Sequence, residues 1–162
     1  HKRCVSNISE FISKISFHRV LEDEAYKKEN NLISLKKDNK IKKVVMCSGK
    51  IYYDLIEERE KTKSNDIVFV RIEQLYPFPA KTLAKVLKKY TKAKFVWCQE
   101  EPKNMGAWNT VRNYIERTLE MINLRVINVK YVGRKAASST ATGNANKHLA
   151  QQKEILEKIL KD

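Results

Sequence analysis

Acidic and amide side chains gather in the stretch WCQEEPKNMGAW, where Gln99, Glu100 and Glu101 follow a short apolar run. Paired carboxylates are the groups that general acid and base catalysis uses. Lysines and Arg134 could instead neutralise Glu73, Glu100 and Glu101 in ordinary ion pairs. We favour that structural role for the three glutamates.

Two further features could carry chemistry. Ser48-Gly49-Lys50 precedes an expected helix and could cradle a phosphate. The glycines of a P-loop or a dinucleotide fingerprint are absent, so a plain strand-to-helix turn is favoured. His18 and His148 stand alone, without a second ligand at metal-binding spacing. The sequence therefore predicts no metal site and no self-contained catalytic residues.

Composition indicates a single domain. The 162 residues, 42% of them apolar, suffice for one core. Cys4, Cys47 and Cys98 are an odd number without paired spacing, which favours free thiols in a reducing, cytoplasmic setting. No apolar run approaches the roughly 18 residues that would span a bilayer. Because the chain begins at His1 without a methionine, we expect a fragment of a longer protein.

The net charge of +14 raises the question of nucleic-acid binding. Of the 33 basic residues 25 are lysines, whereas base and phosphate recognition relies on arginine. The lysines form no single stripe, and no nucleic-acid-binding motif is present. We therefore expect a solvated surface, with neither a nucleic-acid nor a membrane partner.

Hydrophobic periodicity predicts strands that alternate with helices. The expected strands are Val44–Cys47, Ile67–Ile72, Phe95–Cys98 and Arg125–Val132, and the expected helices follow Gly49, follow Pro77-Phe78-Pro79, run from Trp108 to Ile122, and run from about Asn146 to Leu160. This alternation is typical of an α/β fold with a mostly parallel sheet and helices on both faces.

In such a sheet the carboxyl ends of the parallel strands meet at one edge, where ligands and partners usually bind. The segments expected there are Ser48-Gly49-Lys50, Glu73-Gln74, Gln99-Glu100-Glu101 and Gly133-Arg134, the last of them opening a small-residue loop. Trp97, Trp108 and Tyr114 are interpreted as core residues.

Residues 1–42 are expected to form an N-terminal edge segment, and residues 43–162 the main α/β unit of the same domain. A weak helix at Asn7 to Ile12 and an edge strand from Ile15 to Leu21 precede a charged surface excursion from Glu22 to Lys40.

The helix after Trp108 carries a second apolar line at Ala107, Tyr114 and Met121. Either a neighbouring helix of the same domain or an interface with other protein could cover this line. The spacing alone leaves both alternatives open.

Four longer motifs go beyond these patterns: KKVVMCSGKIYYDL, IVFVRIEQLYPFP, KFVWCQEEPKNMGAW and YVGRKAASSTATGNANKHLAQQKEIL. Together they resemble the carboxy-terminal domain of the thiamine-diphosphate-dependent decarboxylase (first) component of the 2-oxoglutarate dehydrogenase complex. The resemblance extends from about His1 to Leu160. It implies a transketolase C-terminal-like fold, a mixed sheet of about five strands with helices on both faces.

The resemblance also implies a function for the parent enzyme. A homodimer would decarboxylate 2-oxoglutarate on thiamine diphosphate and Mg²⁺ and transfer the succinyl group to the lipoyl arm of a dihydrolipoyl succinyltransferase, in a bacterial cytoplasm or a mitochondrial matrix. The cofactor would bind to preceding domains, so this fragment is expected to be inactive, to bind no cofactor and to serve assembly. A stand-alone adaptor or effector-binding module is the alternative.

Family motifs then mark candidate edge residues for an interface or an effector. These are Glu73, Gln74, Gln99, Glu100, Glu101, Trp108, Gly133, Arg134 and His148. The chain departs from the family pattern at Lys135 and at Thr140, where relatives commonly carry prolines. The loop after Arg134 is therefore expected to be looser than in relatives.

Overall fold

The computed structural model describes residues 2–5, 8, 12, 16–26, 33–124 and 128–161. Its elements are β1 (Val20–Leu21), two short 3-10 turns (Glu24–Tyr26 and Asp38–Lys40), β2 (Lys43–Cys47), α2 (Ile51–Thr62), β3 (Ile67–Ile72), α3 (Ala80–Leu87), β4 (Lys94–Pro102), α4 (Trp108–Met121), β5 (Lys130–Arg134) and α5 (Ala145–Lys161). No helix in this described part is long and apolar enough to cross a membrane.

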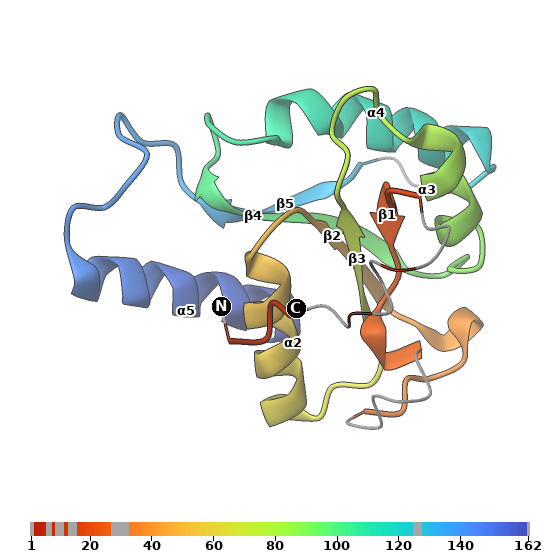
Figure 1. Cartoon of the computed structure of the whole chain (residues 1–162), viewed down its shortest axis with the longest axis horizontal. Coiled ribbons are helices and arrows are strands. Elements are labelled where there is room, and N and C mark those ends of the chain that lie inside the picture. Colours follow the sequence, from red (N-terminus) through yellow and green to blue (C-terminus); the bar gives the residue numbers. More distant parts are fainter. Residues whose placement is uncertain are drawn as a thin grey trace.

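The strands form one sheet in the order β1-β3-β2-β4-β5 (Figure 1). β2, β3, β4 and β5 are parallel to their neighbours, while the short β1 pairs antiparallel with β3. The mixed α/β fold with a mostly parallel sheet is thereby confirmed. It follows from the connections, because a helix between two parallel strands must cross over one face of the sheet.

Helices cover both faces of this sheet (Figure 1). Successive strand residues point to opposite faces, so Val44 and Met46 pack with α3 and α4, whereas Val45 and Cys47 pack with α2 and α5. Trp97 lies in the first of these two cores and is fully buried. Because helices cover both faces of the sheet and exclude water, the strands are continuous apolar runs in the sequence.

Two strands differ from the sequence prediction. β4 continues through Gln99–Glu101, which were expected to form a loop, and ends at Pro102. β5 begins at Lys130 and includes Gly133 and Arg134, which were also expected in a loop. The polar side chains of these residues suggested a loop. The backbone of β4 nevertheless continues to pair with β5, and Pro102 lies opposite Arg134. The start of the expected strand, residues 125–127, lies outside the described residues.

The N-terminal part is also corrected. In the described part of the expected edge strand, Val20 and Leu21 pair with β3. Just beyond this ladder the carbonyl of Arg19 accepts hydrogen bonds from the amides of Glu73 and Gln74. Ile15 and most of the expected helix at residues 7–12 lie outside the described residues, as does part of the Glu22 to Lys40 excursion.

A buried ion pair joins this excursion to the core. The side chain of Asp23 is 0% exposed and that of Arg59 on α2 is 2% exposed. The guanidinium of Arg59 donates to both carboxylate oxygens of Asp23, at 2.5 and 2.8 Å, and the amides of Phe69 and Ala25 donate to the same carboxylate. The segment predicted as a surface excursion thus contributes a buried anchor to the fold.

The main apolar stripe of α4 is confirmed as core, since Trp108, Val111, Ile115 and Leu119 are buried. The second apolar line, at Ala107, Tyr114 and Met121, is covered at one residue and exposed at another. The ring of Tyr114 stacks on that of Phe78, with 5.2 Å between centroids, so the segment before α3 covers it in part. Met121 remains 64% exposed.

Replacing Asp23 with alanine should destabilise the chain strongly, because Arg59 would keep a buried charge without its partner. We expect a loss of about 3 to 5 kcal/mol in the free energy of unfolding, measured by urea denaturation with circular dichroism. Glu60→Ala is the matched control, since Glu60 on the same helix pairs with Arg3 at the surface and should cost at most about 1 kcal/mol. Equal losses for the two variants would contradict the assignment.

Candidate functional site at the carboxyl edge of the sheet

The carboxyl ends of β2, β3, β4 and β5 meet at one edge, as expected for parallel strands. This carboxyl edge holds most of the residues singled out in the sequence. They form three groups: a knot of hydrogen bonds around Gln99, an ion-pair network around Lys50, and a pocket beside Gln74.

The side chain of Gln99 forms the hydrogen bonds that hold the loop between β4 and α4 together. Its Oε1 accepts hydrogen bonds from the indole Nε1 of Trp97 at 2.9 Å and from the backbone amide of Trp108 at 3.0 Å. Its Nε2 donates to the carbonyls of Met105 at 2.7 Å and Pro102 at 3.1 Å. One buried side chain therefore closes the loop and satisfies a free amide at the start of α4.

Two glycines leave room for this knot. Gly106 has a φ of +65°, and a Cβ there would lie 3.0 Å from Gln99 Nε2. A Cβ at Gly133 on β5 would lie 2.4 Å from the hydroxyl oxygen of Tyr131 and 2.8 Å from the carbonyl oxygen of Gln99. Any larger residue at these two positions would force the loop or β5 to move.

The end of β5 is fastened to the same loop. Tyr131 donates from its hydroxyl to the carbonyl of Arg134 at 2.8 Å, and burial raises the pKa of this hydroxyl to about 12, so that it stays a donor at neutral pH. The Nε of Arg134 donates to the carbonyl of Glu100. Asn104 and Ala137 exchange two hydrogen bonds of 2.9 and 3.0 Å. The loop after Arg134 is thus held at its start.

An ion-pair network fills the space between the ends of β2 and β4. Lys50 Nζ lies 3.0 Å from Glu100 Oε1 and 2.8 Å from Asp54 Oδ2, and Gln152 of α5 donates to the same Asp54 oxygen. Burial acts to lower the pKa of Lys50, but its hydrogen bonds to Asp54 and Glu100 outweigh burial and raise it. The lysine partner expected for Glu100 is present. The turn at Ser48-Gly49-Lys50 places Lys50 where it forms these ion pairs.

Glu73 and Gln74 lie away from this group, because β2 separates β3 from β4. Glu73 Oε1 is 3.5 Å from Arg71 Nε. The guanidinium of Arg71 stacks on Tyr52 and donates to the hydroxyl of Tyr53. Glu73 therefore faces a basic and aromatic surrounding of its own, and it forms no carboxylate pair with Glu100 or Glu101.

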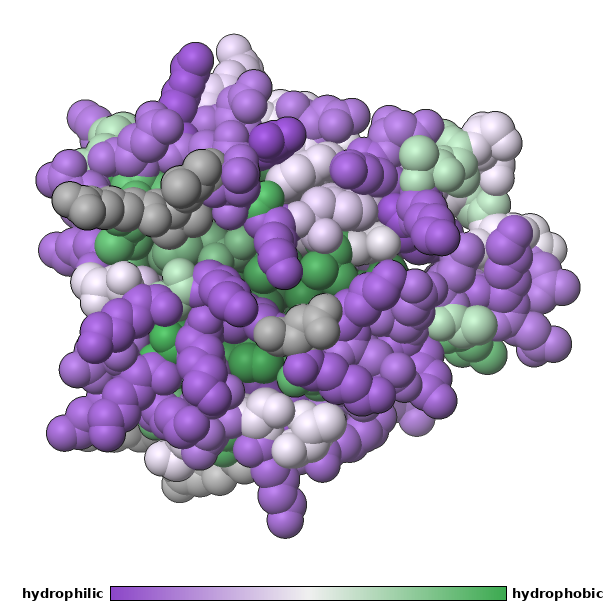
Figure 2. All heavy atoms as spheres, turned by 180° about the vertical axis from the view of Figure 1, so that it is seen from behind, coloured by the Kyte–Doolittle hydropathy of each residue, from purple (hydrophilic) through white to green (hydrophobic). Residues whose placement is uncertain are grey.

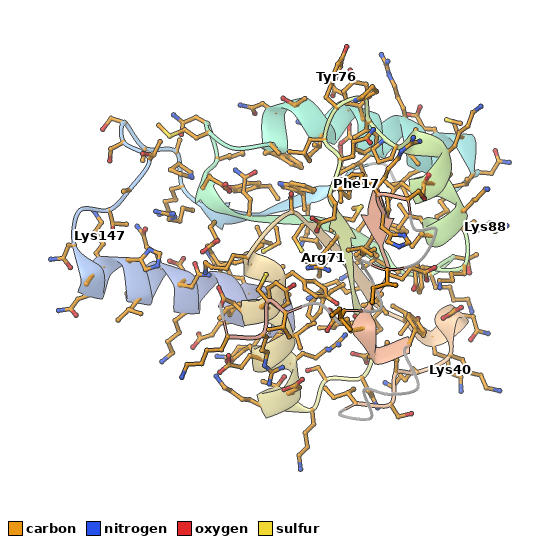
Figure 3. The ribbon with its side chains drawn as sticks, viewed as in Figure 1. Phe17, Lys40, Arg71, Tyr76, Lys88 and Lys147 are labelled. Carbon is orange, nitrogen blue, oxygen red and sulfur yellow. The ribbon has the colours of Figure 1, made fainter. Side chains whose placement is uncertain are left out.

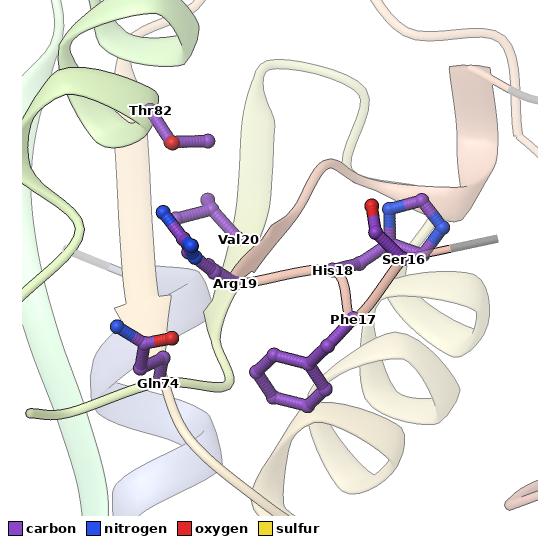
Figure 4. Close-up of a pocket in the computed structure, with 7 residues that line it drawn as sticks. All are labelled: Ser16, Phe17, His18, Arg19, Val20, Gln74 and Thr82. Atoms are coloured by element: carbon purple, nitrogen blue, oxygen red, sulfur yellow. The ribbon is translucent and has the colours of Figure 1, made fainter.

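A pocket of about 520 Å³ opens beside Gln74, where β1 meets the end of β3 (Figure 4). Segments on either side of β3 contribute its wall, which consists of Ser16, Phe17, His18, Arg19, Val20, Gln74 and Thr82. The Nε2 of Gln74 donates to the carbonyl of Pro77, which leaves its Oε1 as a possible acceptor. The guanidinium of Arg19 has no carboxylate partner in the described part of the chain. Such a lining suits a small polar or anionic molecule.

The remaining candidates are dispersed. Glu101 is exposed. His148 lies near the start of α5, where its amide donates to the carbonyl of Asn144. No group of three or more His, Cys, Asp or Glu side chains in the described ranges is placed to hold a metal ion. The structure therefore joins Gln99, Glu100, Trp108, Gly133 and Arg134, but neither Glu73 nor His148.

Four contributors were not identified from the sequence. Tyr131 and Asn104 act through backbone carbonyls and amides, which no residue pattern reports. Arg19 became visible only when β1 was placed against β3. Arg59 left one indication, because it follows Tyr52, Leu55 and Ile56 on the buried face of α2.

Replacing Gln99 with leucine should loosen the whole β4 to α4 connection. The indole of Trp97, the amide of Trp108 and the carbonyl of Met105 would lose their hydrogen bonds to Gln99, whereas the carbonyl of Pro102 would keep the amide of Met105. Each buried unsatisfied group costs about 1 to 3 kcal/mol. We expect a loss of at least about 3 kcal/mol by urea denaturation and a red shift of tryptophan fluorescence. Gln152→Leu, which removes one half-buried amide bond, is the control. A Gln99→Leu variant as stable as this control would refute the role.

The sequences of known proteins match this chain along almost its whole length. The family model described as 2-oxoglutarate dehydrogenase C-terminal matches residues 5–160. The E1 component of 2-oxoglutarate dehydrogenase from Brucella anthropi is 52% identical over 160 residues, and those from Brucella ovis and Brucella canis are 51% identical. The alignments cover 99% of this chain and 16% of each relative, so the chain spans about a sixth of their length. The chain belongs to the 2-oxoglutarate dehydrogenase C-terminal family.

Proposed function

We propose that this chain is the carboxy-terminal domain of the decarboxylase component of a 2-oxoglutarate dehydrogenase. One observation carries the proposal: the family match spans residues 5–160 and thus includes both the core and the knot around Gln99. Relatives that are 51 to 52% identical over 99% of the chain support it. At this identity the buried contacts of the two proteins should correspond.

The parent enzyme would decarboxylate 2-oxoglutarate on thiamine diphosphate and pass the succinyl group to the lipoyl arm of a dihydrolipoyl succinyltransferase. Among the described residues, the carboxylates of the carboxyl edge do not fit the Mg²⁺ and diphosphate group, because Glu100 pairs with Lys50, Glu73 lies by Arg71, and Glu101 belongs to no metal-binding group. We therefore place the cofactor on the part of the parent that this chain does not cover.

The domain would contribute to assembly of a homodimer and of the larger complex. At the carboxyl edge Gln99 and Trp108 are used inside the domain, whereas Glu101 is exposed and Arg134 is half-buried, so these two can reach other protein. The buried free thiols of Cys47 and Cys98 suit the cytoplasm or the mitochondrial matrix.

Arg134→Ala in the full-length enzyme should separate assembly from folding. The side chain donates to one backbone carbonyl, so the domain should lose only about 1 kcal/mol, whereas decarboxylation and dimerisation should fall. Activity is measured as 2-oxoglutarate-dependent reduction of ferricyanide, and assembly by sedimentation. Arg112→Ala, which removes an exposed guanidinium from α4, is the control. A large loss of stability with normal activity would reverse the assignment.

The pocket beside Gln74 favours a second role, the binding of an effector. Arg19 supplies a cation, and His18, Gln74 and Thr82 supply polar groups around it (Figure 4). An effector that carries a carboxylate or phosphate would gain charge-assisted hydrogen bonds from the guanidinium. This role is compatible with the first, because the pocket and the knot around Gln99 lie at different strand ends.

Effector binding can be tested by thermal stability with inorganic phosphate and succinate as probes. A probe at ten times its Kd should stabilise the protein by about 1.4 kcal/mol, and Arg19→Ala should abolish the effect. Arg117→Ala, on the exposed face of α4, should leave it unchanged. Stabilisation that persists in the Arg19→Ala variant would rule out this pocket.

A further inference from the structure

The amino edge of the sheet, opposite the carboxyl edge, concentrates positive charge. It consists of the segments that lead into the parallel strands, residues 33–43, 61–66, 88–94 and 128–130. These segments contain only two carboxylates, Asp38 and Asp66. Figure 3 shows Lys40 and Lys88 on this side of the molecule and Lys147 at the far end.

The lysines of the amino edge lie close together in space. The amide of Lys94 donates to the carbonyl of Lys42 at 2.8 Å, and Lys43 pairs with Lys94 in the sheet register. The amide of Lys40 in turn donates to the carbonyl of Lys37. Segments that are some fifty residues apart in sequence therefore present their lysines side by side.

Most of this charge has no counter-charge among the residues that the structure describes. Asp66 is shared by Lys36 and Lys42, at 2.9 and 3.0 Å, and these contacts lower its pKa. Asp38 accepts a hydrogen bond from Tyr26. Exposed lysines of the amino edge that have no carboxylate partner among the described residues are Lys37, Lys40, Lys63, Lys88, Lys92, Lys94 and Lys130.

Helix dipoles explain only part of this pattern. α2 and α3 end at the amino edge, and lysines in a last turn are stabilised by the free carbonyls there. That accounts for Lys61 and Lys88. Lys94 begins β4 instead, where like charges raise the energy of the isolated domain. Lys40 ends the short 3-10 turn Asp38–Lys40.

We propose that the amino edge is a docking surface for the acidic surface of a partner protein. The compact charge of a lysine ammonium suits single carboxylates that are scattered over a protein surface. Nucleic-acid binding would instead use arginine guanidinium groups that bind phosphates in a bidentate manner and exposed aromatic rings on which bases stack. The nearby ring of Tyr26 is covered by Lys89 at 4.6 Å, and Tyr90 is buried. A membrane surface would call for apolar anchors among the lysines, whereas hydrophilic side chains dominate the surface in Figure 2.

The test uses charge reversal in the full-length protein that carries this chain. Lys40→Glu/Lys92→Glu changes the amino edge, and Lys135→Glu/Lys147→Glu makes the same charge change beyond the carboxyl edge. Binding of fluorescent polyglutamate is measured at about 0.1 M salt, where charges about 10 Å apart still interact. The amino-edge variant should bind about tenfold more weakly, and the control less than about twofold, with melting temperatures unchanged in both.

A duplex DNA oligonucleotide and vesicles of phosphatidylglycerol serve as the other probes. The proposal expects binding to these two to be weaker than to polyglutamate and to respond equally to both double variants. Equal loss of polyglutamate binding in the two variants would overturn the docking surface. A selective loss of DNA or vesicle binding in the amino-edge variant would overturn the choice of a protein partner.

Discussion

The amide of Gln99 is the interaction on which the carboxyl edge depends. Its oxygen and nitrogen bond to β4, to the loop that follows and to the first turn of α4, so three pieces of chain share one buried group. A Cβ at Gly106 would lie 3.0 Å from the Nε2 of this amide, and a Cβ at Gly133 would lie 2.8 Å from the backbone carbonyl oxygen of Gln99. The polar motif around Gln99 thus shapes the edge.

The two ends of the sheet use charge in opposite ways. At the carboxyl edge Lys50 neutralises Glu100 and Asp54, and Arg71 faces Glu73. The pocket beside Gln74 contains the guanidinium of Arg19, which has no carboxylate partner among the described residues. At the amino edge lysines outnumber carboxylates, and only Asp66 neutralises more than one of them. The contacts of the two edges with other molecules should therefore differ. We expect specific hydrogen bonds at the carboxyl edge and salt-sensitive attraction at the amino edge.

The buried pair of Asp23 and Arg59 binds the N-terminal segment to the α/β core. A buried charge pair stabilises little by itself, but either charge alone would be costly, so the pair selects one placement of the segment. That placement sets Val20 beside β3 and brings Arg19 to the pocket. The segment before the first parallel strand thus helps to build a potential binding site.

The sequence by itself determined the α/β class, the parallel strands Val44–Cys47 and Ile67–Ile72, the stripe of α4 and the family, because hydrophobic periodicity and long motifs are local properties. It also brought Gln99, Glu100 and Arg134 to one edge, since parallel strands leave no other arrangement. Only the tertiary structure decided that Asp23 is buried, that Gly133 belongs to a strand, and that Glu73 lies apart from Glu100. Each of these depends on a partner distant in sequence, such as Arg59 for Asp23, and no local pattern encodes which distant groups meet in the packed core.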